Sequence, residues 1–323
     1  MTNPQYVVTT TPHIRASISI EKTMLMVFVA LSPAALMGVV FFGLRALILI
    51  AVAIASAVFS EYVYQKLTKK RVTISDGSAA VTGLLMGLIM PPAVPFWMPA
   101  VGAACAIIIV KQIFGGLGHN FLNPALAGRA ILVAAYALPM TTAFYEPLGP
   151  FNNLGVDIIT SPTPLQSTHF FPQGNDMIYA FVGNISGSIG ETSAVALIIG
   201  GLFLLYKQII SWHIPISFVG TVFLVAAISG SVEIALYHVL TGGLLIGAFF
   251  MATDYPTSPM SSVGKVVFGI GCGIITVVIR FVGGYPEGVA YAILLMNLTV
   301  PLIDRFIRPR VFGTKKGRLL KWG

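Results

Sequence analysis

The sequence has 323 residues, of which 56% are hydrophobic and only 9% are charged, whereas soluble domains carry about 25% charged residues. So little charge cannot cover the surface of a soluble protein, and many apolar runs reach the roughly 20 residues that cross a bilayer. The net charge of +8 comes from Lys and Arg beside apolar runs, which indicates membrane topology and not nucleic-acid binding. We therefore predict an all-α polytopic membrane protein.

Ten apolar segments are expected along the chain, two of them short. The third ends at Pro91-Pro92 and the eighth ends at Asp254-Tyr255-Pro256, which predicts helices that break inside the membrane. The ten segments are 24–44, 45–65, 78–90, 96–114, 121–140, 188–206, 213–231, 235–251, 264–283 and 287–303.

The positions of Lys and Arg predict the orientation, because cytoplasmic loops are enriched in them. With the N-terminus inside, all of the 19 Lys and Arg residues except Arg45 and Arg280 fall on or near the cytoplasmic side. We expect a multi-pass protein of the cell (inner) membrane with both termini cytoplasmic. The expected regions are a cytoplasmic segment 1–23, a transmembrane repeat 24–140, an extracytoplasmic loop 141–187, a second repeat 188–303 and a basic cytoplasmic tail 304–323.

The two halves of the chain resemble each other. The third segment contains GLLMG at 83–87, the eighth contains GLLIG at 243–247, and Lys111 closes the fourth segment as Arg280 closes the ninth. Five segments per half is an odd number, so the second repeat must be inverted. Inverted repeats with interrupted helices are typical of transporters that bind a ligand near the midplane, which predicts a central ligand or ion cavity.

Ionisable residues in or near the spans are costly in a membrane and often functional. Most of those found here lie close enough to a span end to reach the interface by extending their side chains, so no ion path is assigned to them. The six residues are Glu61, Asp76, Lys111, Arg129, Glu233 and Arg280. The two cysteines, Cys105 and Cys272, lie in apolar runs without metal-ligand spacing, and we expect them in the core.

A glycine cluster at 115–118 precedes Asn120 and Asn123-Pro124 on the cytoplasmic side. Asn123 as an N-cap with Pro124 in the first helical position explains that pair structurally. The glycines have a second interpretation, because they would let the backbone approach another chain or a flat cofactor. Both interpretations stay open for this segment.

Two further motifs each allow a structural and a functional interpretation. Residues 187–193, GSIGETS, suit a helix start in which Ser188 caps and Glu191 completes a capping box; alternatively they form a glycine-lined contact to a phosphate or a flavin. Residues 252–259, ATDYPTSP, suit a turn, although so many hydroxyl groups beside a broken span also suit a binding site.

The long polar connection contains DIITSPTPL at 157–165. In a plain outer loop, proline and serine are expected and Asp157 is a solvated charge. Composition alone favours this interpretation. The alternative is an attachment site, because the segment is rich in hydroxyl groups and stiffened by proline.

Four motifs in this order resemble the D subunit of Rnf electron-transport complexes and, more distantly, the B subunit of sodium-pumping NADH:quinone oxidoreductases. The resemblance covers nearly the whole chain. The motifs are Asp76–Ser78 with Pro91-Pro92, Gly118–Arg129, Gly190–Ser193 and Thr253–Pro259.

The resemblance implies an FMN that a dedicated flavin transferase joins through its phosphate to a threonine hydroxyl. The family motif is an Asp followed by a Ser/Thr-Gly-Ala-Thr cluster. On this match Asp157 is the Asp, Thr160 the first hydroxyl residue and Thr163 the acceptor, while Ser161-Pro162 stands in place of Gly-Ala. The transferase works outside the cytoplasm, where the Lys and Arg count independently places Thr163.

The implied function is a membrane flavoprotein subunit of a complex that exchanges electrons between reduced ferredoxin and NAD and moves Na⁺ or H⁺. Implied partners are other Rnf subunits, including a second FMN-bearing subunit and iron–sulfur membrane subunits, and the flavin transferase during maturation. A second, non-covalent flavin such as riboflavin is expected near the cytoplasmic glycine cluster. The further expected flavin contacts are Ser161, Gly190, Glu191, Ser193, Asn120 and Asn123.

Two other functions stay open from the residues alone. The inverted repeat suits a solute channel or secondary transporter without a flavin. A purely structural membrane subunit is the third possibility, and it predicts that Thr163→Val leaves activity intact.

Overall fold

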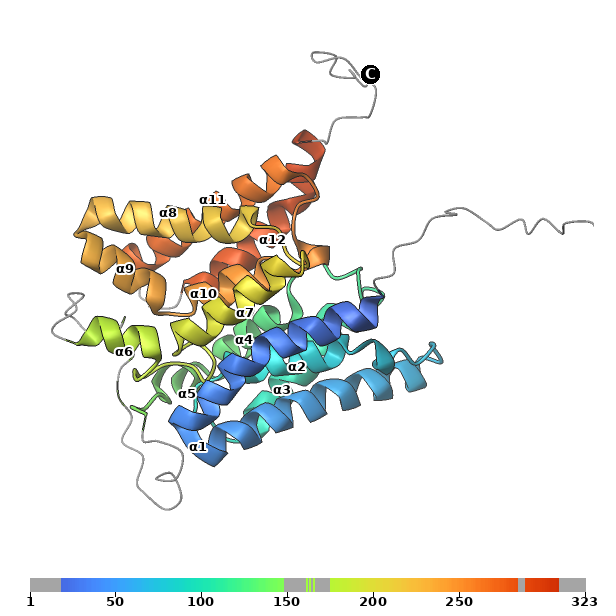
Figure 1. Ribbon diagram of the computed structural model, residues 1–323. Coiled ribbons are helices and arrows are strands. Elements are labelled where there is room, and N and C mark those ends of the chain that lie inside the picture. Colours follow the sequence, from blue (N-terminus) through green and yellow to red (C-terminus); the bar gives the residue numbers. More distant parts are fainter. Residues whose placement is uncertain are drawn as a thin grey trace, which may run out of the picture.

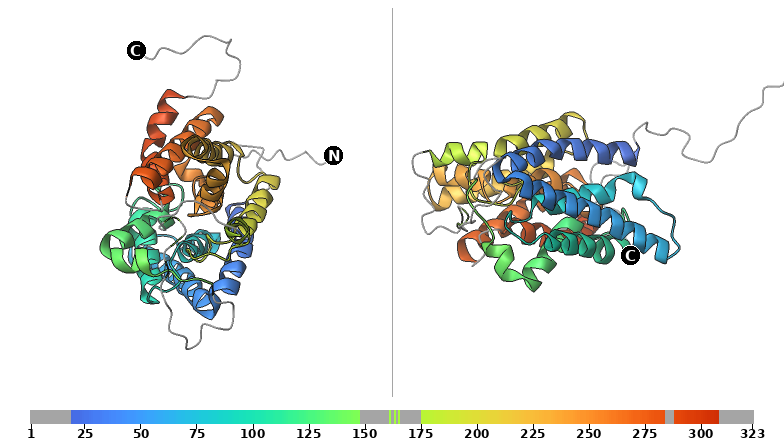
Figure 2. Two further views of the ribbon diagram at one scale, coloured as in Figure 1. Left: turned by 90° about the vertical axis from the view of Figure 1, so that its left-hand side faces the viewer. Right: turned by 90° about the horizontal axis from the view of Figure 1, so that it is seen from below.

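Every regular element in the described part of the chain is a helix, which confirms the all-α prediction. The computed structural model describes residues 19–147, 161, 163, 165, 175–283 and 288–307. Figures 1 and 2 show the helices of the first half, α1 to α5, on one side of the body and α8 to α12 on the other, with α7 beside α1 and α10.

The first element, α1 (Ile20–Leu67), is a folded-back pair of helices rather than one rod (Figure 1). Gly43 breaks it with φ 72° and ψ −161°, a conformation that costs glycine little and L side chains much. The break falls where the sequence predicted the boundary between segments 24–44 and 45–65.

The rest of the first half follows the predicted segments closely. Asn123 caps α4 as expected, since its Oδ1 accepts a hydrogen bond from Leu126 N at 3.2 Å, and Tyr136 separates α4 from α5. The elements are the 3₁₀-helix η1 (Ile74–Asp76), α2 (Ser78–Leu88), α3 (Trp97–Cys105), the π-helix η2 (Ala106–Gln112), α4 (Pro124–Ala135) and α5 (Ala137–Thr142).

The second half contains one helix that the sequence did not lead us to expect, α6, inside the predicted outer loop. Its elements are α6 (Asp176–Val182), α7 (Ala194–Tyr206), α8 (His213–Ser229), α9 (Val232–Leu240), α10 (Leu244–Ile246), the π-helix η3 (Gly247–Met251), the 3₁₀-helix η4 (Tyr255–Thr257), α11 (Ser262–Val282) and α12 (Val289–Phe306).

The start of α7 corrects the predicted capping box. The N-cap is Ser193, whose side chain accepts from Ala196 N at 3.4 Å. Ser188 lies in the preceding turn, where its carbonyl accepts from Glu191 N at 3.1 Å. The capping box is wrong because the side chain of Glu191 has a charged partner elsewhere.

Three helices among the described residues are long and apolar enough to cross a membrane: α1, α11 and α12. A fourth candidate is the pair formed by α9 and residues 244–251, which bends by 64°. The predicted break in the eighth segment is therefore confirmed. The third segment is the 11-residue α2, which ends before Pro91, whereas the exact number of spans and the inverted repeat stay predictions.

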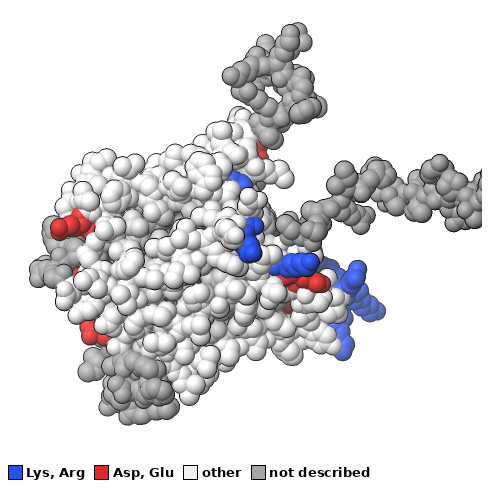
Figure 3. All heavy atoms as spheres, in the orientation of Figure 1, with Lys and Arg blue, Asp and Glu red and all other residues white. Residues whose placement is uncertain are grey.

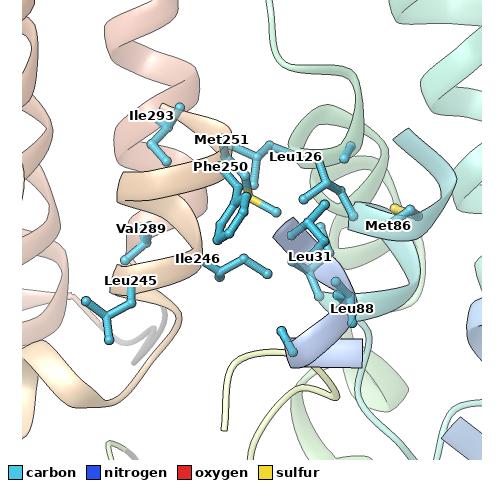
Figure 4. Packing of buried hydrophobic residues seen from close by; sticks show 14 of the residues in the cluster. Leu31, Met86, Leu88, Leu126, Leu245, Ile246, Phe250, Met251, Val289 and Ile293 are labelled. Carbon is cyan, nitrogen blue, oxygen red and sulfur yellow. The ribbon is translucent and has the colours of Figure 1, made fainter. Parts of the chain in front are cut away.

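Small residues let the helices pack closely around a shared core. Gly83 of α2 lies so close to Ile54 and Ala57 of α1 that a Cβ there would come within 3 Å of both. Figure 4 shows that side chains of both halves meet in this core. The labelled residues are Leu31, Met86, Leu88 and Leu126 from the first half and Leu245, Ile246, Phe250, Met251, Val289 and Ile293 from the second.

The charged side chains visible in Figure 3 are unevenly distributed. Lys and Arg gather toward the end of the body where α1 begins, together with some acidic groups, whereas only acidic groups are visible at the opposite end, where Figure 1 shows α6. This arrangement agrees with the expected orientation, in which α1 begins at the cytoplasmic face.

The contact of α1 with α7 is expected to tolerate no side chain at Gly200. A Cβ at Gly200 would clash with the backbone carbonyl of Ala30, and overpacking of this kind costs about 1–3 kcal/mol. We expect Gly200→Ala to lower the melting temperature of the detergent-solubilised protein.

Gly220→Ala in α8 is the control, since a Cβ at Gly220 meets no atom within 4 Å. Replacing a glycine inside a helix by alanine stabilises by up to about 1 kcal/mol, so this variant should melt at the same or a higher temperature. Equal melting of both variants would contradict the assigned packing.

Candidate functional site

A cavity lies at the end of the body where α2 begins and η3 ends; we call it the inner cavity. Its wall combines polar groups with apolar residues such as Leu85 and Phe250. The polar lining residues are Thr23, Ser78, Thr82, Lys111, Asn120, Asn123, Thr253, Asp254 and Tyr255. The structure thus brings the motifs at 76–78, 115–125 and 252–259 into one site.

A buried ion pair lies at the wall of this cavity. Lys111 Nζ lies 2.8 Å from Glu61 Oε2 and 2.6 Å from Ser78 Oγ. Glu61 Oε1 also accepts from Gln112 at 2.8 Å and Gln65 at 3.2 Å. Lys111 and Glu61 are only 2% and 1% exposed, so these two residues do not extend to the interface as was expected of most of the six ionisable residues, because each finds a partner inside the protein.

The two asparagines expected to contact a cofactor both line the inner cavity. Asn123 Nδ2 donates to the carbonyl of Met251 at 3.2 Å, which satisfies the end of η3. Asn120 donates to the carbonyl of Leu122 at 3.1 Å and hydrogen-bonds the side chain of Asp254. Burial raises the pKa of Asp254 to about 6, although hydrogen bonds and the Lys111 charge act in the opposite direction.

A second, smaller pocket lies at the opposite end of α2, and we call it the outer pocket. It brings together three segments that are far apart in sequence. Its lining residues are Thr163, Leu165, Ile185, Ser186, Gly187, Glu191, Thr192 and Gly242. Thr163 is only 5% exposed, so the expected FMN acceptor lies inside the folded protein and not on a solvated loop.

The carboxylate of the outer pocket belongs to a second buried ion pair. Glu191 Oε1 lies 3.1 Å from Arg129 Nη1 of α4, and both side chains are 7% exposed. The Lys and Arg count places Arg129 on or near the cytoplasmic side, which stays a prediction, and the guanidinium of Arg129 points into the protein interior toward Glu191. The pair joins the two halves of the chain.

Two consecutive glycines shape the other wall of the outer pocket. Gly242 and Gly243 have φ of 67° and 69°, a conformation that favours glycine. A Cβ at Gly243 would come within 2.6 Å of Glu191 Oε1, and one at Gly242 would clash with Leu165. Arg280 holds this turn, because its guanidinium donates to three backbone carbonyls, those of His238 at 2.6 Å, Thr241 at 3.2 Å and Gly242 at 3.1 Å.

Two hydroxyl groups near the outer pocket are buried without a hydrogen-bond partner in the described part of the chain: Ser188 Oγ and Thr192 Oγ1. Their residues are 0% and 1% exposed. An unsatisfied buried polar group costs about 1–3 kcal/mol. Such groups indicate a missing partner, and Thr192 lines the pocket directly.

The other expected flavin contacts take different positions. Ser193 caps α7 and Gly190 N donates to Leu88 O at 2.8 Å, so both lie beside the outer pocket without forming its wall. Ser161 N donates to Phe144 O at 2.9 Å. Asp157 and Thr160 lie outside the described residues.

Sequence reasoning did not single out Thr192, Gly242 or the partner of Glu191. The double glycine at 242–243 was the available signal, because consecutive glycines before a broken helix indicate a close backbone approach.

The family of the chain follows from comparison with known proteins. Residues 7–313 match the model of the NQR2, RnfD, RnfE family. The chain belongs to this family.

Three relatives are each covered almost completely by this chain. The D subunit of the Na(+)-translocating ferredoxin:NAD(+) oxidoreductase complex of Acetobacterium woodii is 46% identical over 314 residues, 96% of each chain. The D subunit of the proton-translocating ferredoxin:NAD(+) oxidoreductase complex of Clostridium ljungdahlii is 44% identical over 326 residues, 96% of this chain and 97% of the relative. The D subunit of the ion-translocating oxidoreductase complex of Halorhodospira halophila is 34% identical, with 94% of both chains covered.

Removing one member of the inner ion pair is expected to be costly. Lys111→Met leaves the Glu61 carboxylate buried without its cation, which typically destabilises by about 3–5 kcal/mol. The double variant Glu61→Gln/Lys111→Met should recover most of this loss, and exposed Lys66→Met should change stability by less than about 0.5 kcal/mol. Thermal or denaturant unfolding in detergent measures all three, and a double variant no more stable than Lys111→Met alone would contradict the pairing.

The raised pKa of Asp254 predicts a pH-dependent stability. The folded pKa of about 6 exceeds the ordinary 3.8, so the folded state binds the proton more tightly. The contribution is fully present below pH 3.8 and is lost as the pH rises through about 6. Asp254→Asn should flatten the melting temperature across this window, whereas an unchanged slope would show that another group is responsible.

Proposed function

We propose that this chain is the D-type membrane subunit of an ion-translocating ferredoxin:NAD⁺ oxidoreductase complex, and that it carries FMN as a phosphoester on Thr163. The observation that carries the proposal is the position of Thr163, which is buried in a pocket with Glu191, Thr192 and Gly242. A plain outer loop would leave this hydroxyl in water. The names of the relatives in Acetobacterium woodii and Clostridium ljungdahlii support the assignment of the complex.

The residues of the outer pocket fit a phosphate ester. Phosphoryl oxygens accept hydrogen bonds, and the hydroxyl of Thr192 is a buried donor without a partner in the described chain. Gly187 and Gly242 present backbone without side chains to the pocket. Leu165 and Ile185 add apolar surface, which suits the body of a flavin ring.

When bound, FMN supplies one- and two-electron transfer, and the protein contributes position and electrostatics. The chain's own residues would hold the tether at Thr163 and exclude water from the pocket. The ion pair of Glu191 with Arg129 places a fixed charge pair at the wall, where it would bias the charge that an adjacent group can carry.

The inner cavity is the proposed site of a second, non-covalent flavin such as riboflavin. The carboxamide of Asn120 and the carboxyl of Asp254 offer donors and acceptors for a ring edge, while Phe249 and Phe250 offer apolar surface. This mixture of an apolar wall and few convergent polar groups is typical of cofactor sites.

The short helix α2 connects the two sites. It begins at Ser78 in the inner cavity and ends at Leu88 beside the outer pocket, a length of about 15 Å at the usual helical rise. We propose that electrons pass between partner subunits and these sites, with Na⁺ or H⁺ moved by the assembled complex. The partners would include a second FMN-bearing subunit, iron–sulfur membrane subunits and, during maturation, a flavin transferase.

A solute channel or secondary transporter is the weaker proposal. Such a protein needs a polar route through its body, whereas Figure 4 shows apolar side chains such as Leu88 and Ile246 packed where the two halves meet. A purely structural subunit would have no use for a hydroxyl enclosed at Thr163.

The covalent attachment is tested by denaturing the chain on a gel after co-expression with the flavin transferase and recording flavin fluorescence. We expect fluorescence in the wild type and in Thr163→Ser, and its complete loss in Thr163→Val. Thr168→Val, outside the acceptor motif, is the control and should keep it. A fluorescent Thr163→Val chain would place the attachment elsewhere, and a dark wild type would remove the support for an FMN subunit.

A further inference from the structure

We infer that the phosphodiester lies against the wall of the outer pocket formed by Thr192 and Gly242, and that the Thr192 hydroxyl donates a hydrogen bond to a phosphoryl oxygen. This inference rests on the proposed attachment of FMN at Thr163. It names the residues that would hold the tether in place and so orient the flavin.

The position of Thr163 limits where the phosphoryl group can lie. The phosphorus atom of the ester is bonded directly to Thr163 Oγ1, so its free oxygens must fall within the space that Thr163 lines. Thr192 lines the same space and is 1% exposed. A threonine hydroxyl has one hydrogen to donate, and Thr192 Oγ1 has no hydrogen-bond partner in the described chain.

The opposite wall is backbone rather than side chain. Gly242 lines the pocket with φ 67°, and a Cβ there would clash with Leu165 and approach Arg280 Nη2. The guanidinium of Arg280 binds the carbonyl of Gly242 at 3.1 Å. Leu165 and Arg280 thus pack directly against Gly242, and this wall of the pocket has a buried positive charge behind it.

The carboxylate of Glu191 would repel a phosphodiester in the same pocket if it stood alone. Arg129 lies 3.1 Å from Glu191 Oε1 and compensates its charge. Arg129 is therefore a positioning residue that acts through Glu191, and it keeps the pocket compatible with a negatively charged tether.

Ser188 provides the matched comparison within the same loop. Its hydroxyl is also fully buried and without a partner in the described residues, yet Ser188 does not line the outer pocket. Removing the hydroxyl of Ser188 should therefore act in the same way with or without the flavin, whereas removing that of Thr192 should not.

The test uses the full chain, co-expressed with the flavin transferase and purified in detergent. Thr192→Val and Ser188→Ala are each made in the wild type and in the unflavinylated Thr163→Val chain, and melting temperatures are compared. We expect Thr192→Val to lower the melting temperature of the flavinylated chain by about 2–4 °C. In the Thr163→Val chain the same change should be neutral or stabilising, because it removes an unsatisfied hydroxyl.

Equal shifts from Thr192→Val in both backgrounds would overturn the inference while leaving FMN attachment intact, because gel fluorescence reports attachment separately. If Thr192→Val prevents flavinylation, Thr192→Ser keeps the hydroxyl and must restore it. Phosphorus NMR gives a second readout: the phosphodiester resonance should move in Thr192→Cys, which weakens the donor, and stay in place in Ser188→Ala. An unchanged phosphorus resonance in Thr192→Cys would also contradict the proposed hydrogen bond from Thr192 to the phosphoryl group.

Discussion

The structure depends on satisfying the backbone groups that broken helices expose inside a membrane. Lipid offers no hydrogen bonds, so irregular backbone at that depth must be buried in protein or line a cavity. Here the ends of α2 and η3 are each bonded to a group from the other half of the chain. Leu88 O at the end of α2 accepts from Gly190 N at 2.8 Å, and Met251 O at the end of η3 accepts from Asn123 at 3.2 Å.

These contacts between the two halves of the chain determine where the two cavities lie. α2 has its first residue, Ser78, in the inner cavity, and its last, Leu88, against the loop of the outer pocket. The segment that contains α10 and η3 runs the other way, from Gly242 in the outer pocket to Phe250 in the inner cavity. One pair of short helices therefore positions both candidate cofactor sites, with apolar side chains between them.

A buried ion pair lies beside each of the two cavities. Glu61 with Lys111 lies beneath the inner cavity, and Glu191 with Arg129 lies at the wall of the outer pocket. Isolated charges could not be buried so deeply. Removing one partner of a buried pair destabilises the fold by much more than the intact pair stabilises it. Each pair thus joins two elements of the fold, so the shape of the adjacent cavity depends on the position of both elements.

Much of the fold could be predicted because its signals are local. The length of each apolar run, the break near residue 44 and the cap formed by Asn123 follow from neighbouring residues alone. The start of α7 could not be predicted in this way, because Ser188 and Ser193 are both suitable caps and the choice depends on where Glu191 finds its charged partner. The apolar run of the short helix α6, residues 177–182, was too short to predict a membrane span.

The sequence by itself determined that this is a helical membrane protein with interrupted spans, and residue types in order pointed to its family and to Thr163 as the expected acceptor. Only the tertiary structure decided that Thr163 is enclosed with Thr192 and Gly242, and that Glu191 pairs with Arg129. The physical reason is that these contacts join residues tens of positions apart. They exist only once the two halves have packed and each has satisfied the broken ends of the other.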